Sequence, residues 1–392
     1  MTDVLKRRGL TPVINASGTM TSIGASRVLS DVMAEMSAIS RHFVRIDDLQ
    51  ALASRTIAET CGAEAGFVTS SSAAALSLCV AAALTGDDLA RIEALPALPG
   101  GERRVGLQMG HTVNYGAPVP QAIALAGAEV VPLGTAALCE TYHLRAALEE
   151  GLAAVVHVVS HHTVREGELP LDLVVELCSA HDTPVIVDMA SEYDLRGPVA
   201  AGADAAIYSG HKFLSGPTSG IVAGKAGFIR NVALQTRGIG RITKIGKEGI
   251  LGAIAALEAW QRRDHAAIRA EEDRIVAMWM AELDDIEGLA LSRHADWTGN
   301  PITRVEMRVD PGAAGLCAWE LAERLMARNP AIAVRDDLAE HQVLYLDPCN
   351  LTYDEACVVA QAVGETIDAA RASGDGCRLS WNGVKRRRGG GA

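Results

Sequence analysis

Aromatic residues are scarce in this chain, because Phe, Trp and Tyr together make up only 4% of its 392 residues. The core is therefore expected to consist of aliphatic side chains, and the 49% hydrophobic content suffices for one large and one smaller domain. Acidic residues outnumber basic ones, which gives a formal net charge of -12. This balance argues against a general nucleic-acid-binding surface, so we expect no nucleic-acid partner.

Long apolar runs and closely spaced cysteine pairs are also lacking. No run reaches the roughly 18 apolar residues that a membrane span needs, and the first residues contain no apolar signal core. The eight cysteines form no CxxC pair, and several lie in apolar runs (Cys79, Cys139 and Cys178). We therefore expect buried thiols in a cytoplasmic protein without a membrane partner, and no disulfide framework.

Short β-rich runs alternate with helical patterns between Phe67 and about Gly224. Continuous apolar strands separated by helices predict an α/β domain whose mainly parallel sheet is covered on both faces. One helical pattern from Glu248 to about Asp284 predicts a linking helix, and the strands and helices after Glu287 predict a compact α+β domain.

These patterns divide the chain into five expected parts. They are an N-terminal arm with helices (residues 1–60), a large domain (61–247), the linking helix (248–284), a small C-terminal domain (285–378) and a disordered basic tail (379–392). We expect the opening segment, from Met1 to Ser30, to be irregular, because it is too rich in Gly and Ser for a long helix.

Lys212 is the most informative residue of the sequence. It ends the stretch Ser209-Gly210-His211-Lys212, which follows an apolar run and precedes a Gly-Pro turn. A lysine held there beside a hydroxyl and an imidazole is suited to form a Schiff base. Asp188 ends an earlier apolar run, where a carboxylate can pair with a protonated pyridine nitrogen. Together they indicate pyridoxal 5'-phosphate (PLP); the alternative is a solvated lysine and a helix-capping aspartate.

A third element is the hydroxyl-rich start of a predicted helix. Thr69, Ser70, Ser71 and Ser72 precede the apolar helical stretch 73–80. Hydroxyls and free backbone N–H groups at a helix start form an anion site that would suit the phosphate of the cofactor. On its own this pattern is also typical of an ordinary N-cap.

Several histidines follow predicted strands. His111 is suited to lie over a flat cofactor ring or to carry a proton, although an exposed loop histidine would give the same pattern. His161 and His162 lie just beyond an apolar strand, where active-site groups collect, so we expect one of them near the substrate. His157 lies within that strand and is expected to be a core residue, so we expect no metal site.

Three basic residues are candidates for binding a substrate anion. Arg335 ends a predicted strand of the small domain, where its guanidinium could hold a carboxylate or simply face solvent. Arg241 and Lys244 lie in a basic, Gly-containing loop that would suit a phosphate of the cofactor or substrate, or form a solvated charge run. No GxGxxG follows a strand, and this loop has the wrong spacing for a P-loop.

The order of hydroxyl cup, aspartate and lysine resembles the fold-type I PLP-dependent enzymes of the aminotransferase class V and selenocysteine-synthase-like group. Segments 14–21, 45–49, 69–74 and 209–220 carry the resemblance, which extends from about residue 12 to residue 370. The sequence is most similar to the ammonia-lyase branch, whose members are dehydratase-type enzymes of sugar-acid catabolism. The resemblance implies the PLP-transferase architecture, with a mainly parallel seven-stranded sheet between helices and a smaller C-terminal α+β domain.

The resemblance also implies residue roles. Lys212 would be the Schiff-base lysine, Asp188 the pyridinium partner and His111 the ring neighbour, and the remaining cofactor contacts would be Ser71, Ser72, Ser209 and His211. Such enzymes are homodimers or larger homo-oligomers with sites at the interface, so the loop 237–247 is expected to reach a neighbouring subunit. Selenocysteine synthase carries an additional N-terminal tRNA domain, whereas this chain reaches the resembling arm almost at once, and we expect no tRNA substrate.

The expected function is that of a PLP-dependent lyase. It would act on a 2-amino-3-hydroxy acid, an amino sugar acid or related amino acid, by α,β-elimination to a 2-oxo acid and ammonia. Lys212 would take the Cα proton, and His111, His161 or Lys212 itself would protonate the leaving hydroxyl. The alternatives are a transaminase, a racemase or epimerase, a selenium transferase-like enzyme, a desulfurase using Cys349, and a PLP-binding regulator or substrate-binding module without turnover.

Overall fold

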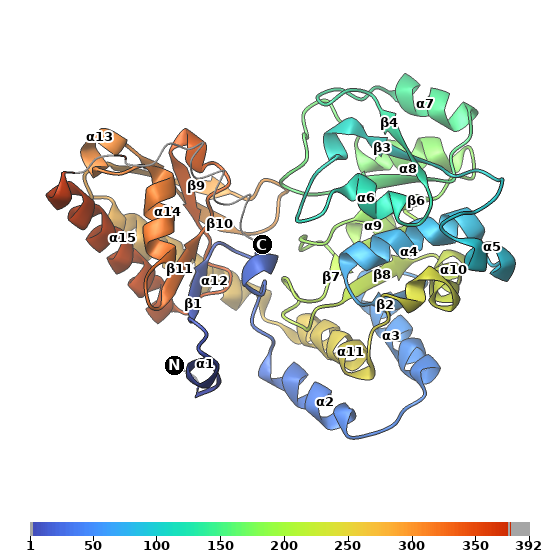
Figure 1. Ribbon diagram of the computed structural model, residues 1–392, viewed down its shortest axis with the longest axis horizontal. Helices are drawn as coiled ribbons and strands as arrows, with labels where there is room; N and C mark the ends of the chain where they lie inside the picture. The colour runs from blue at the N-terminus through green and yellow to red at the C-terminus, as the bar shows by residue number, and fades with distance from the viewer. Residues whose placement is uncertain (1–2, 375–376, 378–392) are drawn as a thin grey trace. The chain divides into compact units, whose positions relative to one another are not determined.

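The computed structural model describes residues 3–374 and residue 377. It divides into two compact units, one formed by residues 27–263 and one by residues 1–26 together with residues from 264 onward. Figure 1 shows both units with their helices and strands. The tail expected at residues 379–392 lies outside the described residues.

The larger unit contains a seven-stranded sheet. Its strands, in spatial order, are β2 (Ala65–Thr69), β8 (Gly220–Gly224), β7 (Ala205–Ser209), β6 (Val185–Asp188), β5 (Ala154–Val158), β3 (Arg104–Gln108) and β4 (Glu129–Leu133). β8 is antiparallel to both of its neighbours, and the other pairs are parallel. The mainly parallel sheet predicted from the sequence is therefore confirmed.

Alternate residues of the central strands enter two different apolar clusters, as a sheet buried on both faces requires. Val185 and Val187 pack into one cluster, whereas Ile186 between them packs into the other. The first cluster contains α2 (Ser30–Ser40), α3 (Ile46–Cys61), α7 (Thr141–Glu149), α8 (Leu171–Ser179) and α11 (Lys247–Arg262). The second contains α4 (Ser72–Thr85), α5 (Leu89–Ala94), α6 (Val119–Ala124) and α10 (Ala226–Leu234). Shorter elements of this unit are α9 (Gly197–Ala200) and the 3-10 turns Met109–His111, Gln235–Arg237 and Ile239–Arg241.

The smaller unit has an antiparallel sheet and a separate strand pair. The sheet has the order β12 (Val343–Leu346), β10 (Thr303–Val309) and β9 (Leu289–Ala295), and β1 (Val13–Ala16) pairs in parallel with β11 (Ala331–Val334). Its helices are α1 (Asp3–Arg8), α12 (His265–Leu283), α13 (Pro311–Ala314), α14 (Ala318–Met326) and α15 (Tyr353–Ser373), with 3-10 turns at Thr21–Ile23 and Ala339–His341.

Two expectations are corrected. The opening segment is not irregular throughout, because β1 finds its partner β11 near the other end of the chain, which local composition does not reveal. The single helix expected over residues 248–284 is two helices that separate at Arg263 and Asp264. Arg263 has extended backbone angles, and the Asp264 carboxylate accepts the N–H of Ala267 at 2.9 Å, which caps the start of α12.

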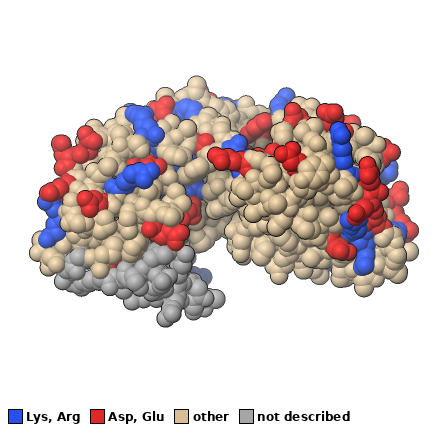
Figure 2. Space-filling model, turned by 90° about the horizontal axis from the view of Figure 1, so that it is seen from above, with Lys and Arg blue, Asp and Glu red and all other residues tan. Residues whose placement is uncertain are grey.

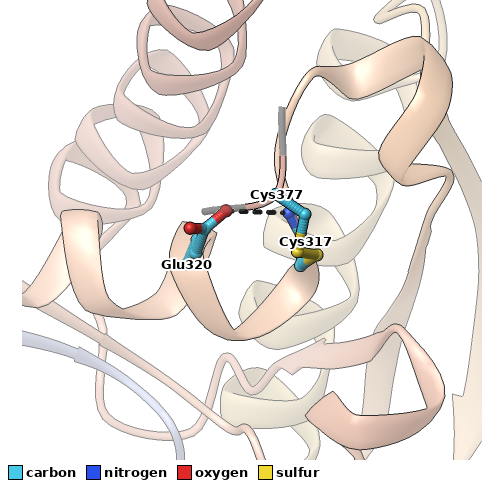
Figure 3. A group of neighbouring side chains, drawn as sticks. All are labelled: Cys317, Glu320 and Cys377. Carbon is cyan, nitrogen blue, oxygen red and sulfur yellow. Dashed lines mark hydrogen bonds between the residues drawn. A yellow bond between two sulfur atoms is a disulfide. The ribbon is translucent and has the colours of Figure 1, made fainter. Parts of the chain in front are cut away.

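The cysteines also differ from expectation at one pair. Cys317 and Cys377 form a disulfide with a Cα–Cα distance of 5.4 Å, and the other six cysteines are free thiols (Figure 3). The pair is separated by 60 residues, so no spacing motif marks it. Glu320 lies beside both sulfurs, but a disulfide offers a metal no thiolate ligand.

Charged side chains of both signs are interspersed on the face drawn in Figure 2. Across the described part of the chain, the helices are all too short or too polar to serve as a membrane span.

Candidate active site

The predicted cofactor residues follow strands that end at one edge of the seven-stranded sheet. The strands β3, β5, β6 and β7 are parallel to one another. His111 follows β3, His161 follows β5 and Lys212 follows β7. Asp188 is the last residue of β6. In open α/β sheets, ligands bind outside the carboxyl ends of such strands.

Lys212 lies in a tight turn between β7 and β8. The turn is closed by the N–H of Gly210, which donates to the Ser219 carbonyl at 2.9 Å, and by the N–H of Ser215, which donates to the Lys212 carbonyl at 3.0 Å. A Cβ atom at Gly210 would lie 2.1 Å from the Ser219 hydroxyl oxygen, so this close approach needs a glycine. The Lys212 side chain is half-buried, in keeping with the partly desolvated lysine that the sequence predicts.

Ser209 ends β7 just before this turn, and His211 precedes Lys212 within it. The Ser209 hydroxyl is buried and lies 3.0 Å from Nδ1 of His211. Burial lowers the pKa of His211, and the positive charge of Lys212 lowers it further. The imidazole is therefore neutral at physiological pH and adds no charge beside the lysine.

Asp188 is buried at the end of β6, and its carboxylate accepts the N–H of Ala190 at 3.1 Å. Burial raises the pKa of Asp188, whereas the Ala190 N–H and the nearby charge of Lys212 lower it. The Asp188 charge in turn contributes to the raised pKa values of Tyr115 and Cys79, for which burial is the larger cause. Lys212, Tyr115 and Cys79 are therefore electrostatic neighbours of Asp188.

The hydroxyl cup adjoins the lysine turn. The Ser71 hydroxyl caps α4 by accepting the N–H of Ala74 at 3.1 Å. The Thr69 hydroxyl donates to the carbonyls of Ser71 and Gly220, at 2.9 and 3.2 Å, which joins the cup to the start of β8. Gly220 directly follows the lysine turn, and a Cβ atom there would lie only 2.2 Å from the Ser71 carbonyl oxygen. The backbones of the cup and of the strand after the turn therefore approach closely. Ser72 begins the 14-residue helix, whose N-terminus favours an anion at this place.

His111 is fully buried and engaged through both ring nitrogens. Its Nε2 lies 2.8 Å from a Glu168 carboxylate oxygen, and its Nδ1 accepts the N–H of Val158 at 3.1 Å. The proton therefore resides on Nε2, since Nδ1 acts as an acceptor. His157 meets the ring edge-on at 4.7 Å, and burial followed by His111 lowers the pKa of His157 to about 3. In this arrangement His111 presents no surface to a flat ring, and its role as ring neighbour stays a prediction.

Sequence reasoning missed Glu168 and Tyr115. Glu168 lies 57 residues from His111, and only the packing of the ends of β3 and β5 brings the two together. Tyr115 shares the loop of His111 and is 39% exposed, so it has the accessible surface that His111 lacks. An aromatic residue among Gly and Asn in a loop after a strand was its only signal.

His161 and His162 lie in the loop after β5, with their ring centroids 3.7 Å apart. The Ser160 hydroxyl accepts the N–H of His162 at 3.2 Å and its carbonyl accepts the Thr163 hydroxyl at 2.7 Å. The loop is therefore ordered near the sheet edge, and a role for His161 stays a prediction.

Arg241 and Lys244 line a cavity of about 790 Å³ between α3, β2, α10 and the loop before α11. Lys212 and Asp188 are not among its lining residues. This cavity is therefore formed by the basic loop without a contribution from the lysine turn.

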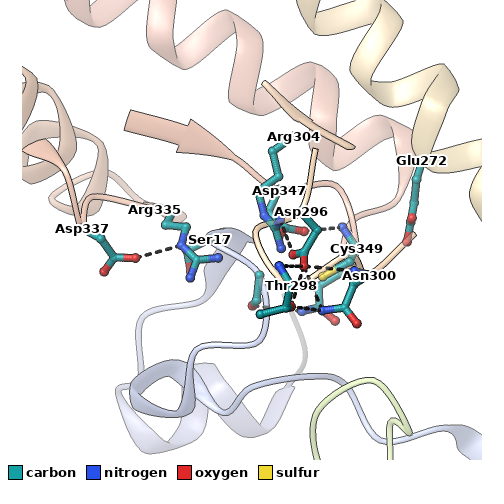
Figure 4. A network of polar contacts seen from close by, with 12 residues as sticks. Ser17, Glu272, Asp296, Thr298, Asn300, Arg304, Arg335, Asp337, Asp347 and Cys349 are labelled. Atoms are coloured by element: carbon teal, nitrogen blue, oxygen red, sulfur yellow. Dashed lines mark hydrogen bonds and ion pairs between the residues drawn. The ribbon is translucent and has the colours of Figure 1, made fainter. Parts of the chain in front are cut away.

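Arg335 lies in the smaller unit, directly after β11. Its backbone exchanges two hydrogen bonds with Tyr345, and its Nε donates to Asp337 at 2.8 Å (Figure 4). The side chain is largely buried, so Arg335 does not face solvent as an ordinary surface arginine would.

No family model matches the chain, but individual proteins do. It is 35% identical to D-glucosaminate-6-phosphate ammonia lyase of Salmonella typhimurium over 94% of this chain and 99% of that protein. It is 36% identical to 5'-C-glycyluridine monooxygenase-decarboxylase of a Streptomyces species over 92% of this chain and 90% of that protein. A solved structure of D-glucosaminate-6-phosphate ammonia-lyase matches with a TM-score of 0.86 at 35% identity, covering 95% of this chain and 100% of the other.

The chain belongs to the fold-type I PLP-dependent enzymes. Similarity to L-seryl-tRNA(Sec) selenium transferase of Nitratidesulfovibrio vulgaris, 27% over 91% of this chain and 81% of that protein, agrees with the selenocysteine-synthase-like branch. The expected fold class is confirmed, and the ammonia lyase matches bear out an enzyme of the lyase type.

A desulfurase of this family would need a nucleophilic cysteine, and Cys349 does not provide one. Burial raises the pKa of the Cys349 thiol well above its usual value, and the neighbouring carboxylate of Asp347 raises it further. Its backbone N–H also donates to Asp347 at 3.0 Å, which holds the residue in place. A thiol that stays protonated is a poor nucleophile.

Proposed function

We propose that this fold-type I enzyme binds PLP at the carboxyl edge of its seven-stranded sheet, covalently through Lys212. The observation that carries the proposal is the joining of the Lys212 turn to the N-terminus of α4 through Thr69, Ser71 and Gly220, with Asp188 as an electrostatic neighbour of the lysine. An amine, an anion site and a buried carboxylate are the three groups that the cofactor needs.

The residues have distinct roles in this proposal. Ser71, Ser72 and Ser209 hold the phosphate with the backbone N–H groups at the start of α4. Asp188 keeps a proton on the ring nitrogen, because a buried carboxylate is most stable beside a positive partner. His211 supports Ser209 at 3.0 Å, and His111 and Tyr115 lie in the loop expected beside the ring.

The proposed reaction is an α,β-elimination on a 2-amino-3-hydroxy acid, an amino sugar acid or related amino acid. PLP, when bound, withdraws the electron pair that the Cα–H bond leaves behind. The Lys212 amine takes the Cα proton, and the β-hydroxyl leaves as water after receiving a proton from Lys212 or His161. His111 is less suited to that step, because both of its nitrogens are engaged. The enamine that is released hydrolyses to a 2-oxo acid and ammonia.

Substrate anions are assigned to basic side chains. Arg335 would bind the carboxylate, and Arg241 with Lys244 would bind a phosphate if the substrate carries one. The ammonia lyase relative is named for a phosphorylated amino sugar acid, which supports a substrate of this class. We further propose a cytoplasmic homodimer or higher homo-oligomer in which the loop 237–247 serves the neighbouring subunit's site.

Oxidative decarboxylation of an amino acid is the second candidate function. It is favoured by the 36% identity to a protein named as a monooxygenase-decarboxylase, over nine tenths of both chains. The two reactions differ in products, since elimination releases ammonia without consuming oxygen, whereas the second reaction consumes oxygen and releases carbon dioxide.

The proposal is tested by spectra and turnover of the purified protein with added PLP. Wild-type protein should absorb visible light through its lysine-bound cofactor and should form ammonia and a 2-oxo acid from D-glucosaminate 6-phosphate or D- or L-serine, with or without oxygen. Lys212→Ala should lose this absorbance and turnover. The matched control is Lys225→Ala, which removes a lysine of the same unit that pairs with Asp204 at 2.8 Å.

Two results would overturn parts of the proposal. A Lys212→Ala variant that retained the chromophore and full activity would remove the cofactor assignment. Oxygen-dependent release of carbon dioxide by the wild-type protein, without ammonia, would replace the lyase reaction by the second candidate.

A further inference from the structure

Trp297 lies under the guanidinium of Arg335. The ring centroid is 4.6 Å from the Arg335 guanidinium carbon, and on the same indole the Arg304 guanidinium lies at 4.9 Å. Tyr345, which pairs with the backbone of Arg335, meets the Trp297 ring edge-on at 5.1 Å. The Trp297 ring therefore contacts the guanidinium groups of both Arg304 and Arg335.

The loop that carries Trp297 is held by Asp296. One oxygen of its carboxylate accepts the N–H and hydroxyl of Thr298, at 2.9 and 2.8 Å, and two N–H groups of Asn300, at 3.1 and 3.2 Å. The other oxygen accepts Nη1 of Arg304 at 2.6 Å. Figure 4 shows these contacts converging between β9 and β10. The indole is therefore presented by a rigid loop.

Arg304 anchors this loop to the core of the smaller unit. It is buried between Asp296 and Asp347, with its Nε donating to Asp347 at 2.7 Å. Burial alone would raise the pKa values of both aspartates, but the positive charge of Arg304 and the hydrogen bonds that each carboxylate accepts together outweigh it and lower them. Both carboxylates stay ionised and Arg304 stays charged, so the salt-bridged support under Trp297 persists across the neutral pH range.

Arg335, by contrast, pairs through its Nε with Asp337, whose side chain is 37% exposed. The Asp337 contact at Nε holds one edge of the Arg335 guanidinium. The Trp297 ring packs against the face of the guanidinium and limits rotation of its plane. A bidentate carboxylate contact requires that plane to be fixed, because two N–H groups must meet two oxygens together. Stacking on the indole supplies this restriction at small entropic cost.

We propose that Trp297 is a positioning residue that holds the Arg335 guanidinium in the orientation required to receive the substrate carboxylate. This inference rests on the proposed function of Arg335. It assigns Arg304, Asp296 and Asp347 to a support for the substrate-binding arginine and gives them no contact with the substrate.

The test compares an acid substrate with its carboxamide. Binding and turnover of D-glucosaminate 6-phosphate and serine, and of the corresponding carboxamides, are measured in wild type, Trp297→Leu, Trp297→Phe and Arg335→Ala. Trp297→Leu should raise KM and Kd for the acids about tenfold while kcat changes less than about twofold, since one desolvated cation–π contact is lost. Binding of the carboxamides should change little, and Trp297→Phe should restore most of the affinity.

The outcomes separate this inference from the function on which it rests. Unchanged acid binding in Arg335→Ala would remove Arg335 as the carboxylate partner. Weakened acid binding in Arg335→Ala with normal binding in Trp297→Leu would overturn the positioning role alone. Equal losses for acids and carboxamides in Trp297→Leu, or no recovery in Trp297→Phe at unchanged melting temperature, would also overturn it.

Discussion

Asp188 is expected to act on turnover far more than on cofactor attachment. Its buried carboxylate is proposed to stabilise a protonated ring nitrogen, whereas Lys212 makes the covalent bond. Asp188→Asn keeps the shape but removes the charge, so kcat should fall on the order of 100-fold or more, as when a preorganised electrostatic partner is lost. The visible absorbance of the lysine-bound cofactor should remain.

The check is steady-state kinetics beside an absorbance spectrum of each variant. Asp194→Asn is a matched control, because Asp194 caps a turn in the same unit through the N–H groups of Arg196 and Gly197. An Asp188→Asn enzyme with wild-type kcat would contradict the assignment.

Single residues were predictable where function depends on a short segment. Ser209 ends β7, and His211 and Lys212 follow directly in the turn after it, so the strand and the Gly-Pro segment on either side mark all three in the sequence. The burial of His111 was not predictable, because it depends on Glu168 in a distant loop. The contact between Trp297 and Arg335 was not predictable for the same reason, because β9, β10 and β11 bring the two residues together only in the folded unit.

At the level of single elements, α4 combines a stability role with a proposed binding role at Ser71. Ser71→Ala removes the side-chain cap that accepts the Ala74 N–H, which should cost about 1 kcal/mol of folding free energy. The same change removes a proposed phosphate contact, so PLP should bind several-fold more weakly. Thermal unfolding with and without PLP, and PLP titration, measure the two effects.

Thr352→Ala is the control for this prediction. Thr352 caps α15 in the smaller unit by accepting the N–H of Glu355 at 3.3 Å. Its loss should lower stability by a similar amount and leave PLP affinity unchanged. Equal PLP affinity in the two variants would contradict a phosphate contact at Ser71.

Glu272 on α12 should make stability depend on pH. Burial raises the pKa of Glu272 from 4.5 to about 8, although Arg269 beside it acts in the opposite direction. Between these pH values the unfolded chain is ionised while the folded chain keeps the proton. The free energy of unfolding should therefore fall as pH rises through this window, by up to about 1.4 kcal/mol per pH unit.

Urea denaturation of wild type and Glu272→Gln between about pH 4 and about pH 9 measures this dependence. The variant cannot ionise, so its stability should be flatter with pH, and the difference between the two proteins should level off below pH 4.5 and above pH 8. Parallel curves for the two proteins would show that Glu272 is ionised in the folded state.

The elements themselves were largely predictable, because strands buried on both faces read as apolar runs and their helices as periodic patterns. The predicted runs around Val105, Val155 and Ile186 became β3, β5 and β6. Two features of the elements were not predictable from the sequence, each for a physical reason. The break at Arg263 and Asp264 interrupts no apolar pattern, and β1 is a strand only because β11 completes its hydrogen bonds.

For the whole molecule, family and fold followed from motifs, whereas substrate identity did not. The chain is similar over most of its length to relatives named for different reactions, a lyase and a monooxygenase-decarboxylase, so overall similarity does not choose the substrate. The anion-binding candidates Arg335, Arg241 and Lys244 are ordinary basic residues in the sequence, and arginines and lysines occur on every protein surface. The role of Arg241 and Lys244 also depends on assembly in our proposal, because they line a cavity that Lys212 does not line.

Mixing two inactive variants tests whether this basic loop serves a second subunit. Lys212→Ala lacks the proposed catalytic amine, and a double variant Arg241→Glu with Lys244→Glu lacks the proposed phosphate contacts. If the loop acts in the partner's site, a hybrid dimer has one site with both the lysine and the intact loop. After subunit exchange at equal amounts, roughly a quarter of all sites would be complete, so roughly a quarter of the wild-type activity on D-glucosaminate 6-phosphate should return.

If the loop serves its own chain, every site lacks either the lysine or the basic loop, and the mixture stays inactive. A monomer in sedimentation, or a fully active double variant, would equally rule out the proposed exchange of this loop.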